Sequence, residues 1–166
     1  MDSVVQPGHY SGFATNDYDW GFLMPKFVLV TGGFDPLHKG HIAYLEAAFR
    51  LGDGLIVGLN SDAWLQRKKG KHFMDFEDRK AVLDALWMVD EVWDFDDSDG
   101  SASAFIRKFL DEFPDSRVVF ANGGDRTEQN IPEMAVDDYR VEFAFGVGGD
   151  DKLNSSSTIL ERWNRG

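Results

Sequence analysis

The chain of 166 residues contains no cysteine. It can therefore form neither a disulfide framework nor a thiolate metal site. It also lacks a run of the roughly 20 apolar residues that a membrane-spanning helix needs. Its first residues, MDSVVQPGHYSGF, do not have the basic and then apolar order of a secretory signal. These absences predict a cytoplasmic protein.

Positive charge is also scarce in this sequence. The chain has 17 Lys and Arg residues against 29 Asp and Glu residues, and its formal net charge is -12. Such a charge repels the phosphates of nucleic acids and anionic membranes, so we expect neither as a partner. The exception is a basic cluster, RKKGK, at residues 67–71. This cluster either binds a small phosphorylated ligand or is a solvated charged surface.

The length and the hydrophobic content of 43% fit one domain with a single core. Residues 1–25 are rich in Gly, Asp, Asn and Tyr and show no sustained periodicity. This composition predicts an extended N-terminal arm, which Trp20, Phe22 and Leu23 would anchor. Residues 26–166 make up the predicted domain.

From Lys26 onward, short apolar runs alternate with amphipathic stretches. This alternation predicts an α/β fold, a single Rossmann-like domain with a mainly parallel five-stranded sheet flanked by helices. The expected strands are residues 27–31, 55–59, 92–95, 118–121 and 141–145.

Three helices are predicted between these strands. Asp75 is placed to cap one of them, with Asp78 at its third position, and this helix should run through Leu86. The other two have apolar faces that end at Gly52 and at Pro114. The first of these faces contains Ile42, Leu45, Ala48 and Phe49, and the second contains Ala102, Phe105, Ile106, Phe109, Leu110 and Phe113.

The string GGFDPLHKGH at residues 32–41 has the most unusual chemistry in the chain. It follows an apolar strand, and ligands of parallel sheets gather at the carboxyl ends of strands. The glycines permit close backbone approach, and the amide groups of the helix start that follows suit a phosphate. His38 and His41 lie three residues apart, so they project to one side of that helix start. Both imidazoles would donate hydrogen bonds to phosphate oxygens as charge builds in a transition state.

This string resembles the HxGH signature of the nucleotidylyltransferase superfamily. The superfamily includes glycerol-phosphate and phosphoethanolamine cytidylyltransferases and several adenylyltransferases of sugar and coenzyme biosynthesis. The similarity continues through LGDGLIVGLNSD (51–62), RKKGK (67–71), DRKAVLDALWMVDEVWDF (78–95), NGGD (122–125) and NSSSTI (154–159), and covers about residues 26–162. In order and spacing the chain most resembles the heptose-phosphate adenylyltransferases.

The resemblance implies a role for each residue of the signature. The two histidines would bind the triphosphate and stabilise the pentavalent transition state. Asp35 would orient the loop or assist a magnesium ion. The nucleotide would be lined by Thr31, Gly32, Gly33, Phe34 and Gly40, and phosphates would be contacted by lysines of the basic cluster, Lys68, Lys69 and Lys71.

Two further segments complete the expected site. NGGD follows an apolar strand, so the backbone of its glycines would approach the base while Asp125 binds a hydroxyl or a base edge. This group is Asn122, Gly123, Gly124 and Asp125. Three serines before the last amphipathic stretch place hydroxyls and amides at a helix start, which suits a phosphate. They are Ser155, Ser156 and Ser157.

Departures from the family patterns bear on the substrate. The chain has WMVDEV at 87–92 where cytidylyltransferases usually have RYVDEV, and DDKLNSS at 150–156 where they have RTEGIST. These differences favour ATP over CTP. Leu160 replaces the arginine that follows the corresponding segment in nicotinate-mononucleotide adenylyltransferases. Asn122 replaces the lysine that usually precedes GGD in the heptose branch.

The sequence thus predicts an enzyme that transfers a nucleoside monophosphate from ATP or CTP to a small phosphorylated sugar or polyol, with release of pyrophosphate. No covalent enzyme intermediate is needed, because the acceptor phosphate is already anionic. Magnesium is expected on the triphosphate, although its protein ligands cannot be identified, and the resemblance implies a homodimer.

The sequence leaves alternative functions open. One is a coenzyme-biosynthesis adenylyltransferase of the pantetheine-phosphate or nicotinate-mononucleotide type, which the Phe-Asp-Pro order favours. Another is a non-catalytic nucleotide-binding module. A nicotinamide dehydrogenase is disfavoured because TGGFDP lacks the GxGxxG order. A zinc site is disfavoured because the chain has four histidines and no evident third ligand near the signature pair.

Overall fold

The computed structural model describes residues 24–149 and 155–165. Its centre is a sheet of five strands that are all parallel, in the order β3-β2-β1-β4-β5. The structure therefore confirms the predicted fold class. The strands are β1 (Lys26–Gly32), β2 (Gly54–Leu59), β3 (Glu91–Trp93), β4 (Arg117–Ala121) and β5 (Val141–Ala144).

Alternating side chains of the strands divide the core into two halves. Val28 and Val30 of β1 belong to one buried cluster, while Leu29 between them belongs to the other. Successive residues of a strand point to opposite faces, and both faces of this parallel sheet are covered, so its strands are apolar throughout. All six residues of β2 are buried.

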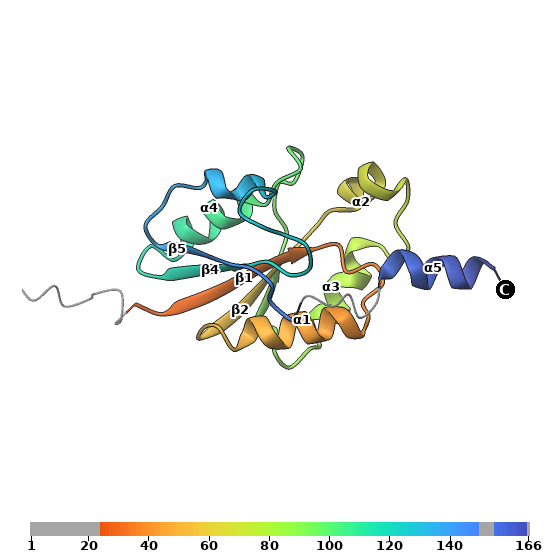
Figure 1. The fold of residues 1–166 in the computed structure, drawn as a ribbon, viewed down its shortest axis with the longest axis horizontal. Helices are drawn as coiled ribbons and strands as arrows, with labels where there is room; N and C mark the ends of the chain where they lie inside the picture. The colour runs from red at the N-terminus through yellow and green to blue at the C-terminus, as the bar shows by residue number, and fades with distance from the viewer. Residues whose placement is uncertain (1–23, 150–154, 166) are drawn as a thin grey trace, which may run out of the picture.

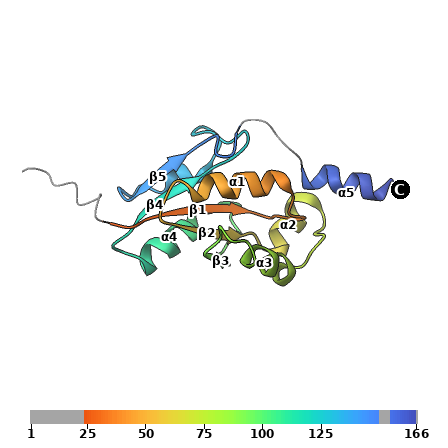
Figure 2. The same ribbon diagram turned by 90° about the horizontal axis from the view of Figure 1, so that it is seen from below.

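Helices cover both faces of the sheet (Figures 1 and 2). The helix α1 (Lys39–Phe49) packs on the face of Val28 and Val30, and α4 (Ser103–Glu112) packs on the opposite face. The remaining elements are α2 (Asp62–Lys69), α3 (Phe76–Asp84), the short 3-10 helix η2 (Pro132–Ala135) and α5 (Ser156–Asn164). None of the helices in the described ranges has the length and apolar character to cross a bilayer.

Several predicted boundaries need correction. The third strand is Glu91–Trp93 rather than 92–95, and the fifth ends at Ala144 rather than at residue 145. The helix that Asp75 was expected to cap ends at Asp84, not at Leu86, and the Asp75 side chain makes no capping hydrogen bond. Its carboxylate instead lies 2.9 Å from His72 Nε2.

The helix α2 was not predicted, although the basic cluster forms its last turn. Its segment shows no apolar stripe, and Leu65 is its one buried residue. The local signal was the cap at Ser61, whose hydroxyl accepts a hydrogen bond from the Trp64 amide at 3.0 Å. The predicted N-terminal arm with its three anchors lies outside the described residues.

Candidate active site

The loop from β1 into α1 places both signature histidines at the start of that helix. His38 is the N-cap residue, and its Nδ1 accepts a hydrogen bond from the Gly40 amide at 3.1 Å. His41 Nδ1 in turn accepts a hydrogen bond from the His38 amide at 3.3 Å. The two imidazoles therefore serve as a reciprocal capping box for α1, and this fixes their orientation.

The capping geometry also determines which nitrogen of each ring carries the proton. A neutral imidazole has one donor and one acceptor nitrogen, and Nδ1 of both rings is the acceptor. Each neutral ring therefore carries its proton on Nε2. The rings stack at a centroid distance of 3.8 Å with 21° between their planes. As a result, the two rings present their Nε2 donors side by side.

His41 stays neutral because its surroundings disfavour the imidazolium. Burial lowers the pKa of His41 from 6.5 to about 3, and the charges of His38 and Lys69 add to this effect. The edge of the ring packs on Phe34 at a centroid distance of 5.0 Å, and Phe34 is buried. A neutral Nε2–H would donate to a phosphate oxygen without a preceding proton exchange.

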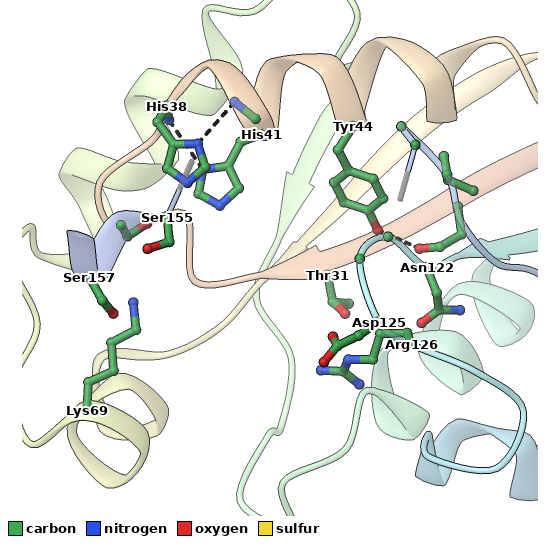
Figure 3. A pocket seen from close by; sticks show the side chains of 18 residues that line it. Thr31, His38, His41, Tyr44, Lys69, Asn122, Asp125, Arg126, Ser155 and Ser157 are labelled. Atoms are coloured by element: carbon green, nitrogen blue, oxygen red, sulfur yellow. Dashed lines mark hydrogen bonds between the residues drawn. The ribbon is translucent and has the colours of Figure 1, made fainter. Parts of the chain in front are cut away.

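Both histidines line a cavity of about 550 Å³ at the carboxyl ends of the central strands, which we call the larger cavity. Figure 3 shows the histidines with Ser155, Ser157 and Lys69 at one end. Tyr44, Asn122, Asp125 and Arg126 lie at the other end. The predicted residues that line this cavity are Thr31, His38, Gly40, His41, Lys69, Asn122, Gly123, Gly124, Asp125, Ser155, Ser156 and Ser157.

A second helix start meets the histidine end of the larger cavity. Ser155 is the N-cap of α5 and accepts a hydrogen bond from the Thr158 amide at 3.1 Å. The Ser156 hydroxyl donates to the Pro36 carbonyl oxygen at 2.9 Å, which ties α5 to the β1–α1 loop. The starts of α1 and α5 thus converge here, as both ribbon views show. Two helix N-termini with their amide groups make a favourable site for a polyphosphate.

Backbone groups of two glycine turns form the opposite end. The Val147 amide donates to the Asn122 carbonyl oxygen at 3.0 Å, so the two turns lie side by side. Tyr44 supports them, because its hydroxyl donates to the Ala121 carbonyl oxygen at 2.5 Å, and desolvation of the phenol raises the pKa of Tyr44. Gly148 has φ +87 and a Cβ there would lie 2.9 Å from Tyr44 Cα, so only glycine fits.

The three lysines of the basic cluster differ in position. Lys69 lines the larger cavity, whereas Lys71 is exposed and lines neither cavity. The Lys68 ammonium lies 4.4 Å from the centroid of the Trp64 ring. Burial lowers the pKa of Lys68, and the nearby charges of Arg126 and Lys69 lower it further. This mutual repulsion among cations is relieved when an anion binds between them.

A second cavity, of about 180 Å³, adjoins the first and is called the smaller cavity. It shares Thr31, His41, Lys69, Arg126 and Ser156 with the larger cavity. Of the predicted nucleotide-lining residues, it contains Gly32, Gly33 and Phe34, which do not line the larger cavity, and it also contains Lys68.

Asp35 lines neither cavity. Its carboxylate is buried and accepts hydrogen bonds from the Phe73 amide at 2.7 Å and the Met74 amide at 2.8 Å. This geometry agrees with the loop-orienting alternative. Arg79, which is 1% exposed, joins the same region by donating to the carbonyl oxygens of Gly33 and other residues. Its remaining acceptors are Met74 O, Asn60 O and Asp62 Oδ1.

Carboxylates near the larger cavity are few. Asp125 is the one carboxylate side chain among the described residues that line it. One other group, Asp62, His72 and Asp75, has side-chain atoms close enough to hold a metal ion. Asp62 is already paired with the guanidinium of Arg79 at 2.6 Å, and none of the three residues lines a cavity described above.

A comparison with protein families supports the resemblance in the sequence. The family model described as cytidylyltransferase-like matches residues 29–158. The chain belongs to the cytidylyltransferase-like family. The match spans the strand before the signature histidines, the basic cluster, the glycine turn and the serine start of α5, so the cytidylyltransferase-like domain contains every part of the site described above.

Curated relatives of this cytidylyltransferase-like chain include two proteins named "Bifunctional protein HldE". The relative from Blochmanniella floridana is 39% identical over 143 residues, which are 79% of this chain and 28% of that protein. The relative from Syntrophotalea carbinolica is 36% identical over 148 residues, 85% of this chain and 28% of that protein. The chain thus spans about a quarter of the length of these relatives.

Solved structures agree on the fold. A lipopolysaccharide core biosynthesis protein from Thermoplasma volcanium is 26% identical, with a TM-score of 0.52 over 73% of this chain and 95% of its own. A nicotinate-nucleotide adenylyltransferase candidate from Vibrio parahaemolyticus is 15% identical, with a TM-score of 0.58 over 86% of this chain and 88% of its own. The second likeness concerns the fold alone.

The sequence alone did not reveal three titratable residues that line the cavities. Arg126 directly follows the NGGD turn, so a cation beside a predicted ligand turn was an available signal. Tyr44 lies one helical turn after His41, a spacing that places both side chains on the same face of α1. Glu133 lies in a segment without periodicity, and no local signal identified it.

Proposed function

We propose that this chain transfers a nucleoside monophosphate from a nucleoside triphosphate to the phosphate of a small sugar or polyol. The proposal rests on the convergence of the two imidazole Nε2 groups and two helix starts at one end of the larger cavity. This arrangement suits charge that develops on a phosphoryl group. The transfer needs no nucleophilic serine or cysteine.

The reaction is a direct displacement. An oxygen of the acceptor phosphate forms a bond to the α-phosphorus of the triphosphate, and the bond from that phosphorus to the β-bridging oxygen breaks. The electron pair of the broken bond leaves with pyrophosphate. The acceptor phosphate carries close to two negative charges near neutral pH, so no side chain must remove a proton. The protein contributes alignment and charge stabilisation.

The residues of the two cavities divide this work. His38 and His41 donate from Nε2 to phosphate oxygens in the transition state. The amide groups at Ser156 and Ser157 bind the β- and γ-phosphates. Lys69 lines both cavities and would contact the phosphates of both substrates. The base and ribose occupy the end formed by the glycine turns.

Magnesium fits this site through the substrate. The ion binds triphosphate oxygens readily, keeps several waters and needs few protein ligands. Asp125, the carboxylate of the larger cavity among the described residues, would hold the ion through such a water. The metal would neutralise charge on the triphosphate.

Two features support a phosphorylated sugar or polyol as the acceptor. The relative from Thermoplasma volcanium is a lipopolysaccharide core biosynthesis protein, which associates this domain with sugar chemistry. The lining of the smaller cavity includes cations and polar groups such as Asn60 and Ser101, which suit the phosphate and the hydroxyls of such an acceptor.

The proposal is tested by pyrophosphate release. Purified protein is supplied with magnesium, with ATP or CTP, and with heptose 1-phosphate, mannose 1-phosphate or glycerol phosphate. We expect release that depends on both substrates, and a higher kcat/KM with ATP than with CTP. If the order of the two nucleotides is reversed for every acceptor, the adenylyl preference is wrong. Absence of release with all pairs, although a triphosphate raises the melting temperature, would instead favour a nucleotide-binding module.

A further inference from the structure

One side chain of the smaller cavity has a property that the fold does not explain. Glu133 of η2 is 4% exposed. Its Oε1 accepts a hydrogen bond from the Ala102 amide at 2.6 Å, and Ala102 is the N-cap residue of α4. Its Oε2 is buried and has no hydrogen-bond partner among the described residues.

The capping contact requires a single oxygen. A glutamine would make it equally well with its amide carbonyl, because only one acceptor faces the Ala102 amide. The second carboxylate oxygen has no hydrogen-bond donor within residues 24–149 and 155–165, and an unsatisfied buried acceptor costs about 1–3 kcal/mol. A carboxylate at this position is therefore unfavourable for the fold unless a bound molecule donates to Oε2.

The position of Glu133 indicates which molecule that is. Glu133 lines the smaller cavity together with Lys68, Lys69 and Arg126. A phosphate is attracted to these cations and repelled by the carboxylate, so it binds at the cationic end. The group that reaches Glu133 is then a hydrogen-bond donor, and the carbon part of a sugar or polyol phosphate supplies hydroxyls of this kind.

We propose that Glu133 determines acceptor specificity, with Oε2 accepting a hydrogen bond from one hydroxyl of a phosphorylated sugar or polyol. This inference rests on the proposed function, since it assigns the smaller cavity to the acceptor of that reaction. It predicts that the enzyme discriminates against an acceptor that lacks this hydroxyl, because Oε2 then stays buried without a donor.

The test combines deoxy substrates with an isosteric variant. The preferred acceptor among heptose 1-phosphate, mannose 1-phosphate and glycerol phosphate is compared with its monodeoxy analogues in the pyrophosphate assay. For the wild-type protein, one analogue should show a kcat/KM lower by about tenfold or more. Glu133→Gln should lower kcat/KM for the parent acceptor by a similar factor, and should leave that analogue within about twofold of its wild-type value.

Controls separate specificity from structure. Glu128→Gln removes the same charge from an exposed position of the same segment that lines neither cavity, and should leave all values unchanged. The melting temperature of Glu133→Gln should stay within about 4 °C of the wild type, because the cap of α4 is retained. If this variant does not fold, the deoxy series on the wild-type protein still decides the question.

Two outcomes would overturn the inference. One is a wild-type enzyme that uses every monodeoxy analogue within about twofold of the parent. The other is a Glu133→Gln variant whose kcat/KM falls by the same factor for the parent acceptor and for all analogues, which indicates a structural role. If no acceptor supports turnover, the proposed function fails separately. The dissociation constants of the same acceptors and analogues, measured by calorimetry with α,β-methylene ATP present, then show whether Glu133 accepts a hydrogen bond from a hydroxyl.

Discussion

His41 should stay unprotonated in the free protein far below the pH at which histidine usually titrates. Burial, together with the charges of His38 and Lys69, lowers the pKa of His41 from 6.5 to about 3. At about pH 5, a histidine with the ordinary pKa is about 97% protonated. With a pKa near 3, as given for His41, only about 1% is protonated.

The lowered pKa of His41 makes the free energy of unfolding depend on pH. As the pH falls below about 6.5, the unfolded chain binds a proton at His41 while the folded protein does not. The contribution of His41 to folding is therefore fully present above about pH 6.5 and is lost as the pH falls toward about 3. The loss is at most about 1.4 kcal/mol per pH unit, and solvent screening of the partly exposed ring makes it smaller.

Histidine-selective NMR between about pH 2 and about pH 8 measures this pKa, with His41→Gln to assign the resonance. Lys69→Gln should raise the pKa of His41, because one of the charges that lower it is removed. Lys71→Gln provides the matched control, since Lys71 is not among the charges that shift His41. A wild-type midpoint near 6.5, or equal effects of the two lysine variants, would refute the electrostatic account.

Three further predictions concern the scaffold and the basic cluster. Arg79→Met should reduce the free energy of unfolding in urea by about 3–5 kcal/mol, because it leaves the carboxylate and carbonyl partners of a buried guanidinium unpaired, and a loss below about 1 kcal/mol would contradict this. Asp35→Asn should cost about 1–3 kcal/mol, since its amide group opposes one of the two backbone donors, and unchanged stability would argue against that role. Lys69→Ala should raise the apparent triphosphate KM at least several-fold, whereas Lys71→Ala should be nearly neutral as an exposed charge, and equal small effects would mean that the cluster is solvated surface.

The sheet was predictable from the sequence because its strands are buried on both faces. Continuous apolar runs such as those of β1 and β2 contrast clearly with the polar loops around them. The predicted limits of the short edge strand β3 were wrong, because it has one buried residue, Val92, and its limits depend on pairing with β2. The helix α2 was missed for a related reason, because its core contribution is the single residue Leu65.

The site was partly predictable for a different reason. The signature histidines and the glycine turns are local motifs, so their spacing carries the information. The partners that complete the cavities come from distant segments, and only the fold brings them together. Glu133 is hydrogen-bonded to Ala102, which is 31 residues away in the sequence, and Tyr44 is hydrogen-bonded to Ala121, which is 77 residues away. Asp35 could not be assigned before its two amide donors were known.

The most direct test of the account is the pair of measurements that separates binding from chemistry in His41→Ala. Turnover should fall by about 100-fold to 1000-fold, the scale expected when one transition-state donor is lost. The dissociation constant for the magnesium complex of ATP should change by less than about threefold, because the helix starts and lysines still bind the phosphates. A variant that retains turnover within about threefold of the wild type would contradict the role assigned to the paired imidazoles.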